Sequence, residues 1–414
     1  MSKIRINDFG PVKGGFRGND GWLEINKVTV FVGNQGSGKS TVAKLISVFT
    51  KIEKSLVRGD FEKDWVETKN RFKSSYLPYH RLEDYLNENS KIEYIGDKFS
   101  ITYENEYLTV NEVKNSKYSM PKIMYVPAER NLLTYIKSAE ELKLSSEALQ
   151  DFSSEYYNAM QVINGNAMFL PINETEIRYD KRSDELYLKS NDFRIKLRVA
   201  SSGFQSFVPL YLVSDYLAKS VKQQSGKKTA MSSEETAKFQ KGLRTIWDNE
   251  HLTDSQQRQA ISELASVFNK TAFVNIVEEP EQNLFPSSQW QMLQSLLALN
   301  NMNIGNKLII TTHSPYLINY LTVLIKAKQV LDYLSNDKKE TLSSEISNLG
   351  ISLNSCINAD QVSIYEMEEK TGIIKSLPKY NDLIPSDDNF LNNMLANTNN
   401  LFAELQEIEE ENEN

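Results

Sequence analysis

The stretch 33-GNQGSGKST-41 decides the fold of this chain. It matches the pattern G-x-x-x-x-G-K-[ST] and lies between a strand-like segment at 23–32 and a helix-like segment at 40–57. Glycines within the stretch let the backbone curl so that its N–H groups face phosphates, and the following helix adds the positive end of its dipole. A chance match in a flexible linker is the alternative, but the flanking strand and helix favour a phosphate-binding loop.

The residue types of this loop predict separate roles. Lys39 supplies a cation for the outer phosphates of a nucleotide, and the hydroxyl of Ser40 can ligate Mg²⁺. The nucleotide-binding candidates are Gly33, Asn34, Gln35, Gly36, Ser37, Gly38, Lys39, Ser40 and Thr41.

Two further apolar segments end in residues that suit phosphate chemistry. The segment 273-FVNIVEEPE-281 predicts a strand that ends in carboxylates, where Glu278 would hold the water shell of Mg²⁺. Glu279 would orient or deprotonate the attacking water. The segment 307-KLIITTHSP-315 places His313 where α/β sheets bind ligands. A solvated turn after the first strand, and a surface or packed histidine after the second, are the alternatives.

The segment 199-VASSGFQS-206 predicts an anion-binding helix start, with Ser201, Ser202 and Gly203 before a helix that begins near Phe204. An ordinary helix cap has the same pattern and remains the alternative.

Composition bounds the class of protein. The chain has 414 residues with 40% hydrophobic residues, no apolar run near the about 18 residues that span a bilayer, and no apolar leader at its start. Its single cysteine excludes an intrachain disulfide, so we expect a reducing cytoplasm. The net charge of −8 comes largely from six glutamates in 404–414, which predict a solvated acidic tail.

Alternating strand and helix patterns at both chain ends predict an α/β fold with a parallel or mixed sheet, an antiparallel β subdomain and helical insertions. We expect a single domain over 1–400 followed by an acidic tail over 401–414. Its expected parts are a phosphate-loop lobe (1–58), an inserted β/helical segment (59–198), the serine-glycine turn with a helical insertion (199–270), the acidic-strand and histidine lobe (271–330) and a C-terminal segment (331–400).

The order of these motifs resembles that of an ABC-type ATPase. GNQGSGKST resembles the Walker A loop, ASSGFQS the signature motif, VEEPEQNLFP Walker B with its D-loop, and TTHSP the switch-histidine segment. The resemblance implies Mg²⁺-dependent hydrolysis of ATP to ADP and phosphate, with Glu279 as the catalytic glutamate and His313 as the γ-phosphate sensor. It also implies that signature residues reach the nucleotide of a second subunit, namely Ser201, Ser202, Gly203 and Gln205.

Within that superfamily, NDFGPVKG, the EEPE form of Walker B and YVPAER are similar to the AAA ATPases of the OLD/RecF-like group. That group includes ATPase subunits of the bacterial anti-phage systems Septu and PARIS. Glu129 and Arg130 of YVPAER end a short strand and are further candidates to face the nucleotide. Two departures from the usual ABC pattern are Glu278 in place of Asp, and Phe204 in place of Gly.

These observations predict an ATPase that dimerises around nucleotide and controls a separately encoded effector, a nuclease, in anti-phage defence, without a membrane partner. The insertion 217–270 or the tail after Asn389 would form part of the contact. The alternative is a RecF-like DNA-repair ATPase, suggested by seven Lys/Arg against two Glu over 219–244. A nucleotide-binding scaffold with little turnover is the third possibility.

Overall fold

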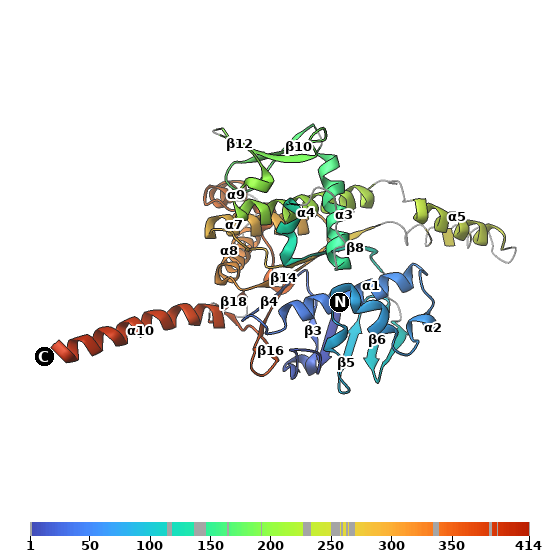
Figure 1. Cartoon of the computed structure of the whole chain (residues 1–414), viewed down its shortest axis with the longest axis horizontal. Coiled ribbons are helices and arrows are strands. Elements are labelled where there is room, and N and C mark those ends of the chain that lie inside the picture. Colours follow the sequence, from blue (N-terminus) through green and yellow to red (C-terminus); the bar gives the residue numbers. More distant parts are fainter. Residues whose placement is uncertain are drawn as a thin grey trace.

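The fold is known from a computed structural model (Figure 1). It describes residues 2–413 except 114–117, 136–145, 164, 192, 227–232, 250–256, 258–259, 262–263, 265–269, 334–338, 381–382 and 387.

A seven-stranded sheet in the order β2-β16-β15-β4-β14-β13-β8 forms the centre of the molecule. Neighbours from β15 to β8 run parallel, whereas β16 is antiparallel to β15. The strands are β2 (Gly15–Phe16), β4 (Val28–Gly33), β8 (Pro121–Val126), β13 (Ala272–Glu278), β14 (Lys307–Thr312), β15 (Val362–Met367) and β16 (Ile373–Ser376).

Helices cover both faces of this sheet, which explains its nearly continuous apolar strands. Helix α1 (Lys39–Val57) packs on one face, and α4 (Ser202–Gly226), α7 (Pro286–Asn300) and α8 (Pro315–Asp332) lie on the other (Figure 1). Alternate residues of one strand therefore enter different hydrophobic clusters: on β4, Val30 joins the cluster with α7, whereas Phe31 joins the cluster with α1.

Two antiparallel sheets flank this core. One has the order β3-β1-β5-β6-β7 and packs beside α1, and the other has the order β12-β11-β10-β9. Their strands are β1 (Lys3–Asn7), β3 (Leu23–Glu24), β5 (Lys91–Ile95), β6 (Phe99–Glu104), β7 (Tyr107–Glu112), β9 (Ala167–Phe169), β10 (Glu176–Asp180), β11 (Glu185–Lys189) and β12 (Arg194–Lys196).

The remaining α-helices and two short strands lie around this core. Helices α5 and α10 project from opposite sides of the body (Figure 1). The remaining elements are α2 (Lys63–Val66), α3 (Glu147–Val162), α5 (Ser233–Trp247), α9 (Lys339–Asn348), α10 (Phe390–Glu413) and the short strands β17 (Lys379–Tyr380) and β18 (Ile384–Pro385). Among the described residues, no helix is long and apolar enough to cross a membrane.

The predicted fold class is confirmed, with a mixed α/β core, antiparallel β sheets and inserted helices. The single strand expected at 23–32 is wrong, because a turn in which Asn26 N donates to Thr29 Oγ1 separates β3 from β4. The helix expected to begin near Phe204 begins at Ser202 and continues to Gly226. The acidic residues expected in a tail lie in α10, which is exposed over 401–409.

Candidate active site

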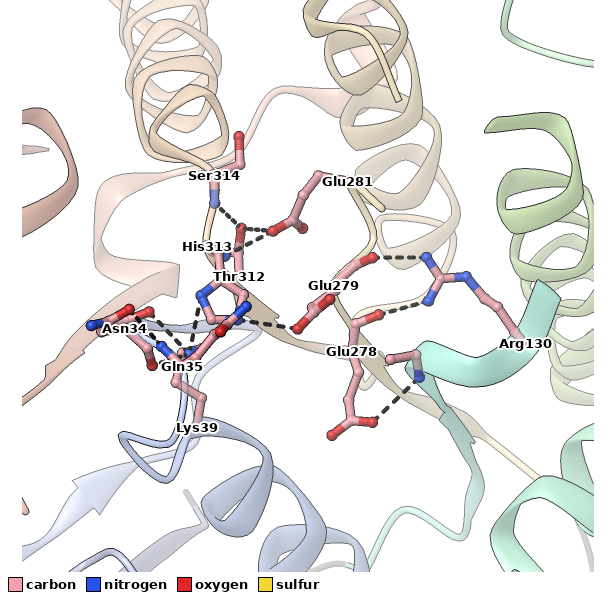
Figure 2. A network of polar contacts seen from close by, with 12 residues as sticks. Asn34, Gln35, Lys39, Arg130, Glu278, Glu279, Glu281, Thr312, His313 and Ser314 are labelled. Carbon is pink, nitrogen blue, oxygen red and sulfur yellow. Dashed lines mark hydrogen bonds and ion pairs between the residues drawn. The ribbon is translucent and has the colours of Figure 1, made fainter. Parts of the chain in front are cut away.

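The candidate site lies where parallel strands of the central sheet reach the same edge. Because β4, β14 and β13 are neighbours, the loops after them bring Lys39, His313, Glu278 and Glu279 together (Figure 2). The structure thus assembles residues from the Walker A-like loop, the acidic strand end and the histidine segment, which are far apart in sequence.

At two positions of the phosphate loop, the backbone has a conformation that only glycine adopts easily. Gly38, the residue before α1, has φ 97°, and a Cβ there would lie 3.0 Å from Val12 Cγ2. A Cβ on Gly33 would lie 2.4 Å from the carbonyl oxygen of Met367 on β15. Side chains at these positions would therefore distort the loop at the positive end of α1.

Lys39 is buried inside the loop. Its Nζ donates to the carbonyl oxygens of Gly33 at 2.9 Å and Asn34 at 2.7 Å, and lies 3.5 Å from His313 Nδ1. Burial lowers the pKa of Lys39 to about 8, and the glutamates after β13 oppose that shift. A partly desolvated cation beside the N-terminus of α1 is suited to binding phosphate.

Glu279 and His313 contact each other directly. His313 Nε2 lies 3.1 Å from Glu279 Oε1 (Figure 2). This hydrogen bond lowers the pKa of Glu279, so its carboxylate stays ionised at neutral pH and can accept a proton or a hydrogen bond from water. The backbone of Glu279 is left-handed, with φ 42°, and its N–H donates to Thr311 O at 2.9 Å.

Glu281 fixes the histidine loop, a role that the sequence analysis did not assign. Its Oε1 accepts from Thr312 Oγ1 at 2.7 Å and from the His313 N–H at 2.8 Å. Burial raises the pKa of Glu281. The third acid of the EEPE stretch was a signal for this role, but only the fold reveals its partners.

Glu278 and Ser40 are the candidate Mg²⁺ ligands. Glu278 is 5% exposed, and its carboxylate accepts a long hydrogen bond of 3.4 Å from Ala128 N. Ser40 lies in the first turn of α1. A carboxylate and a hydroxyl are oxygen ligands that Mg²⁺ accepts, and the remaining ligands in such sites come from phosphates and water. These residues therefore fit the ion.

Arg130 points into the protein interior, which does not support its expected contact with nucleotide. Its guanidinium is fully buried and donates to backbone carbonyls, including those of Glu278 at 2.8 Å and Glu279 at 2.7 Å (Figure 2). Glu129 is exposed in the short 3-10 helix that follows β8, and its contact with nucleotide stays a prediction.

The signature-like segment is divided between surface and interior. Ser201 and Ser202 are exposed where α4 begins, and a Cβ on Gly203 would lie 2.8 Å from the carbonyl oxygen of Asn283. Gln205 is buried; it accepts from Tyr135 Oη at 2.7 Å and donates to the Arg198 carbonyl at 2.9 Å. The Gln205 amide is therefore occupied within its own chain, contrary to the expected contact with a second subunit.

Residues 257–318, which include β13, the glutamates and His313, match the family of AAA ATPase domains. This partial match supports ATP hydrolysis by the chain. The match covers the ends of β13 and β14 and does not include the phosphate loop at 33–41. No curated protein matches the chain.

Solved structures similar to the ATPase include heads of SMC proteins and an ATP-binding cassette. The SMC head domain from Thermotoga maritima has a TM-score of 0.36 at 10% identity, covering 91% of this chain and 98% of that chain. The Pyrococcus furiosus Smc head with an extended coiled coil, bound to the C-terminal domain of ScpA, has a TM-score of 0.33 at 9% identity, covering 98% and 100%. The dimeric cassette MJ0796 bound to ADP and Pi has a TM-score of 0.27 at 11% identity, covering 92% and 100%.

Proposed function

We propose that the ATPase hydrolyses Mg·ATP between two copies of the chain. The observation that carries this proposal is the contact chain in which Lys39 Nζ lies 3.5 Å from His313 Nδ1 while His313 Nε2 lies 3.1 Å from Glu279 Oε1. It joins a phosphate-binding cation to an ionised carboxylate through one imidazole.

Each residue of this chain has a task in the proposed reaction. Lys39 and the N–H groups of the loop bind the phosphates, and Ser40 and Glu278 would hold Mg²⁺, which supplies charge stabilisation when bound. Glu279 is ionised at neutral pH, and its carboxylate orients the attacking water and accepts its proton. His313 holds the Glu279 carboxylate beside Lys39 and lies within reach of the outer phosphate.

The exposed start of α4 supports a site completed by a second copy. Ser201 and Ser202 lie at the positive end of a long helix, which favours an anion, and both are exposed. A symmetric dimer would place this helix start of each copy on the nucleotide of the other.

Mixing two inactive variants tests this arrangement. Ser202→Arg should retain nucleotide binding by the monomer and lose dimerisation and turnover, whereas Lys39→Ala should lose binding. Because neither variant should form a dimer with itself, the dimers in an equal mixture are heterodimers with one intact site of two, and the mixture should recover up to roughly half of wild-type turnover. Each variant alone is the control. Absence of recovery, with heterodimers detected by size-exclusion chromatography, would contradict a two-copy site.

We further propose that the ATPase controls a separately encoded effector, a nuclease, in anti-phage defence. Support comes from the resemblance to defence ATPases and from the projecting helices α5 and α10 (Figure 1). Helix α10 carries a run of exposed apolar side chains at helical spacing, as expected of a protein-binding surface. They are Met394, Leu395, Leu401, Phe402, Leu405 and Ile408.

Two variants test the two candidate contact regions separately. Deletion of 222–236 alters the insertion 217–270, and the double variant Leu401→Glu/Leu405→Glu alters α10. We expect at least one of them to retain ATP turnover while losing co-purification of the protein encoded by the adjacent gene. Asn412→Asp is the control for added charge on α10. Retention of both turnover and partner by both variants, or an adjacent gene whose product does not interact, would contradict the effector proposal.

DNA is the alternative partner of the ATPase. In the basic stretch 219–244, Lys219 pairs with Asp215 at 2.8 Å and Lys238 with Asp60 at 2.6 Å, which reduces the charge available for phosphates. Steeply salt-dependent DNA binding that is lost on neutralising Lys241 and Arg244 would favour this alternative.

A further inference from the structure

Arg130 is a buried cation whose partners are all backbone carbonyls. It lies in a short 3-10 helix after β8, over Ala128–Thr134, and is 0% exposed. Its Nε donates to Ser206 O at 2.9 Å, its Nη1 to Pro127 O at 3.1 Å and Glu278 O at 2.8 Å, and its Nη2 to Glu279 O at 2.7 Å.

Stability alone does not account for this arrangement. Burial lowers the pKa of Arg130 to about 10, so the guanidinium still carries its charge at neutral pH. Moving a charge out of water is costly, and well-packed apolar residues often replace buried ions without loss of stability. The fixed fork of guanidinium donors, in contrast, can hold several acceptors in one geometry, which an apolar side chain or lysine cannot do.

The bonds from Arg130 to Glu278 and Glu279 hold an unfavourable backbone conformation. Glu279 is left-handed at φ 42°, which is uncommon for a residue other than glycine and persists only where the surroundings enforce it. Arg130 binds the two carbonyls that flank the Cα of Glu279, namely those of Glu278 and Glu279 (Figure 2). These bonds fix the direction in which the Glu279 side chain leaves the strand.

The bond from Arg130 to Ser206 holds the start of α4. Ser206 lies one helical turn after Ser202, and its carbonyl accepts from Arg130. The Ser206 hydroxyl also accepts from Asn283 Nδ2 at 3.1 Å, and Gly203 packs against the carbonyl of Asn283. The exposed end of α4 is therefore joined by direct contacts to the segment that follows Glu279.

We propose that Arg130 is a positioning residue that aims the Glu279 carboxylate and couples it to the position of the α4 start. The inference rests on the proposed function, because it needs Glu279 to act on the attacking water. When a second copy contacts Ser202, a shift of α4 would reach Glu279 through Ser206 and Arg130.

A double-mutant cycle tests this proposal. Arg130→Met should lower kcat about 100-fold, the size of loss that a misplacement of about 1 Å causes, while the Kd for ADP stays within about threefold of wild type. In the Glu279→Gln background, where the positioned carboxylate is gone, Arg130→Met should change the single-turnover rate by less than about threefold. Arg130→Lys should not rescue kcat, because an ammonium lacks the fork of donors.

The outcomes separate this proposal from the proposed function. Absence of ATP hydrolysis by the wild type would defeat the proposed function itself. With an active wild type, an unchanged kcat of Arg130→Met, or an equal loss in the Glu279→Gln background, would overturn the positioning role. If Arg130→Met does not fold, Arg130→Lys takes its place under the same criteria, because lysine keeps the charge and lacks the fork of donors.

Discussion

Replacement of Glu279 by glutamine removes one charge from the site with little change in shape. Glutamine keeps an oxygen that can accept from His313 Nε2, which lies 3.1 Å from Glu279 Oε1. The backbone bonds from Arg130 to the residue are independent of the side chain and should remain. The substitution therefore isolates the carboxylate's ability to take a proton from water.

The expected loss in Glu279→Gln follows from that chemistry. A positioned base contributes about 10²- to 10⁴-fold to a rate, so kcat should fall by at least about 10²-fold, or about 2.7 kcal/mol of barrier. Nucleotide affinity should not weaken, because Lys39 and the loop are untouched and a negative charge near the phosphates is removed. The variant should accumulate as an ATP-bound dimer.

Phosphate release and size-exclusion chromatography in the presence of Mg·ATP measure both expectations. Glu366→Gln, on β15, is a matched control that should hydrolyse ATP at the wild-type rate. If Glu279→Gln also hydrolyses ATP at the wild-type rate, the catalytic carboxylate has been assigned to the wrong residue.

Two further substitutions have distinct expected effects. Glu278→Gln should raise the Mg²⁺ concentration for half-maximal turnover by roughly tenfold or more, because a charged oxygen ligand is lost; an unchanged Mg²⁺ titration would exclude Glu278 as a ligand. Ile310→Ala, at a fully buried position of β14, should lower the free energy of unfolding by about 2–5 kcal/mol in denaturant titration, and a loss below about 1 kcal/mol would contradict the packing described for the central sheet.

Local sequence patterns were sufficient to predict the parts of the site. The phosphate loop, the acidic strand end and the histidine segment are each defined by a few consecutive residues next to an apolar strand, so their elements could be predicted. Their convergence also followed, because parallel strands place their carboxyl ends at one edge.

Contacts between distant segments could not be predicted in this way. Arg130 bonds to Ser206 and Glu279, which are 76 and 149 residues away along the chain, so its orientation depends on how β8, β13 and α4 pack. The inward Gln205 amide has the same cause. Strand β15 was missed because its buried residues alternate incompletely and no recognisable motif follows it.

The most direct test of the account is a calorimetric titration of ATP into the wild type and Lys39→Ala. Lys39 contacts only loop carbonyls and His313 among the described residues, so Lys39→Ala should stay folded with a melting temperature close to that of the wild type. We predict measurable ATP binding by the wild type and none by Lys39→Ala. Equal ATP affinity of the two proteins would contradict the assignment of the nucleotide site to this loop.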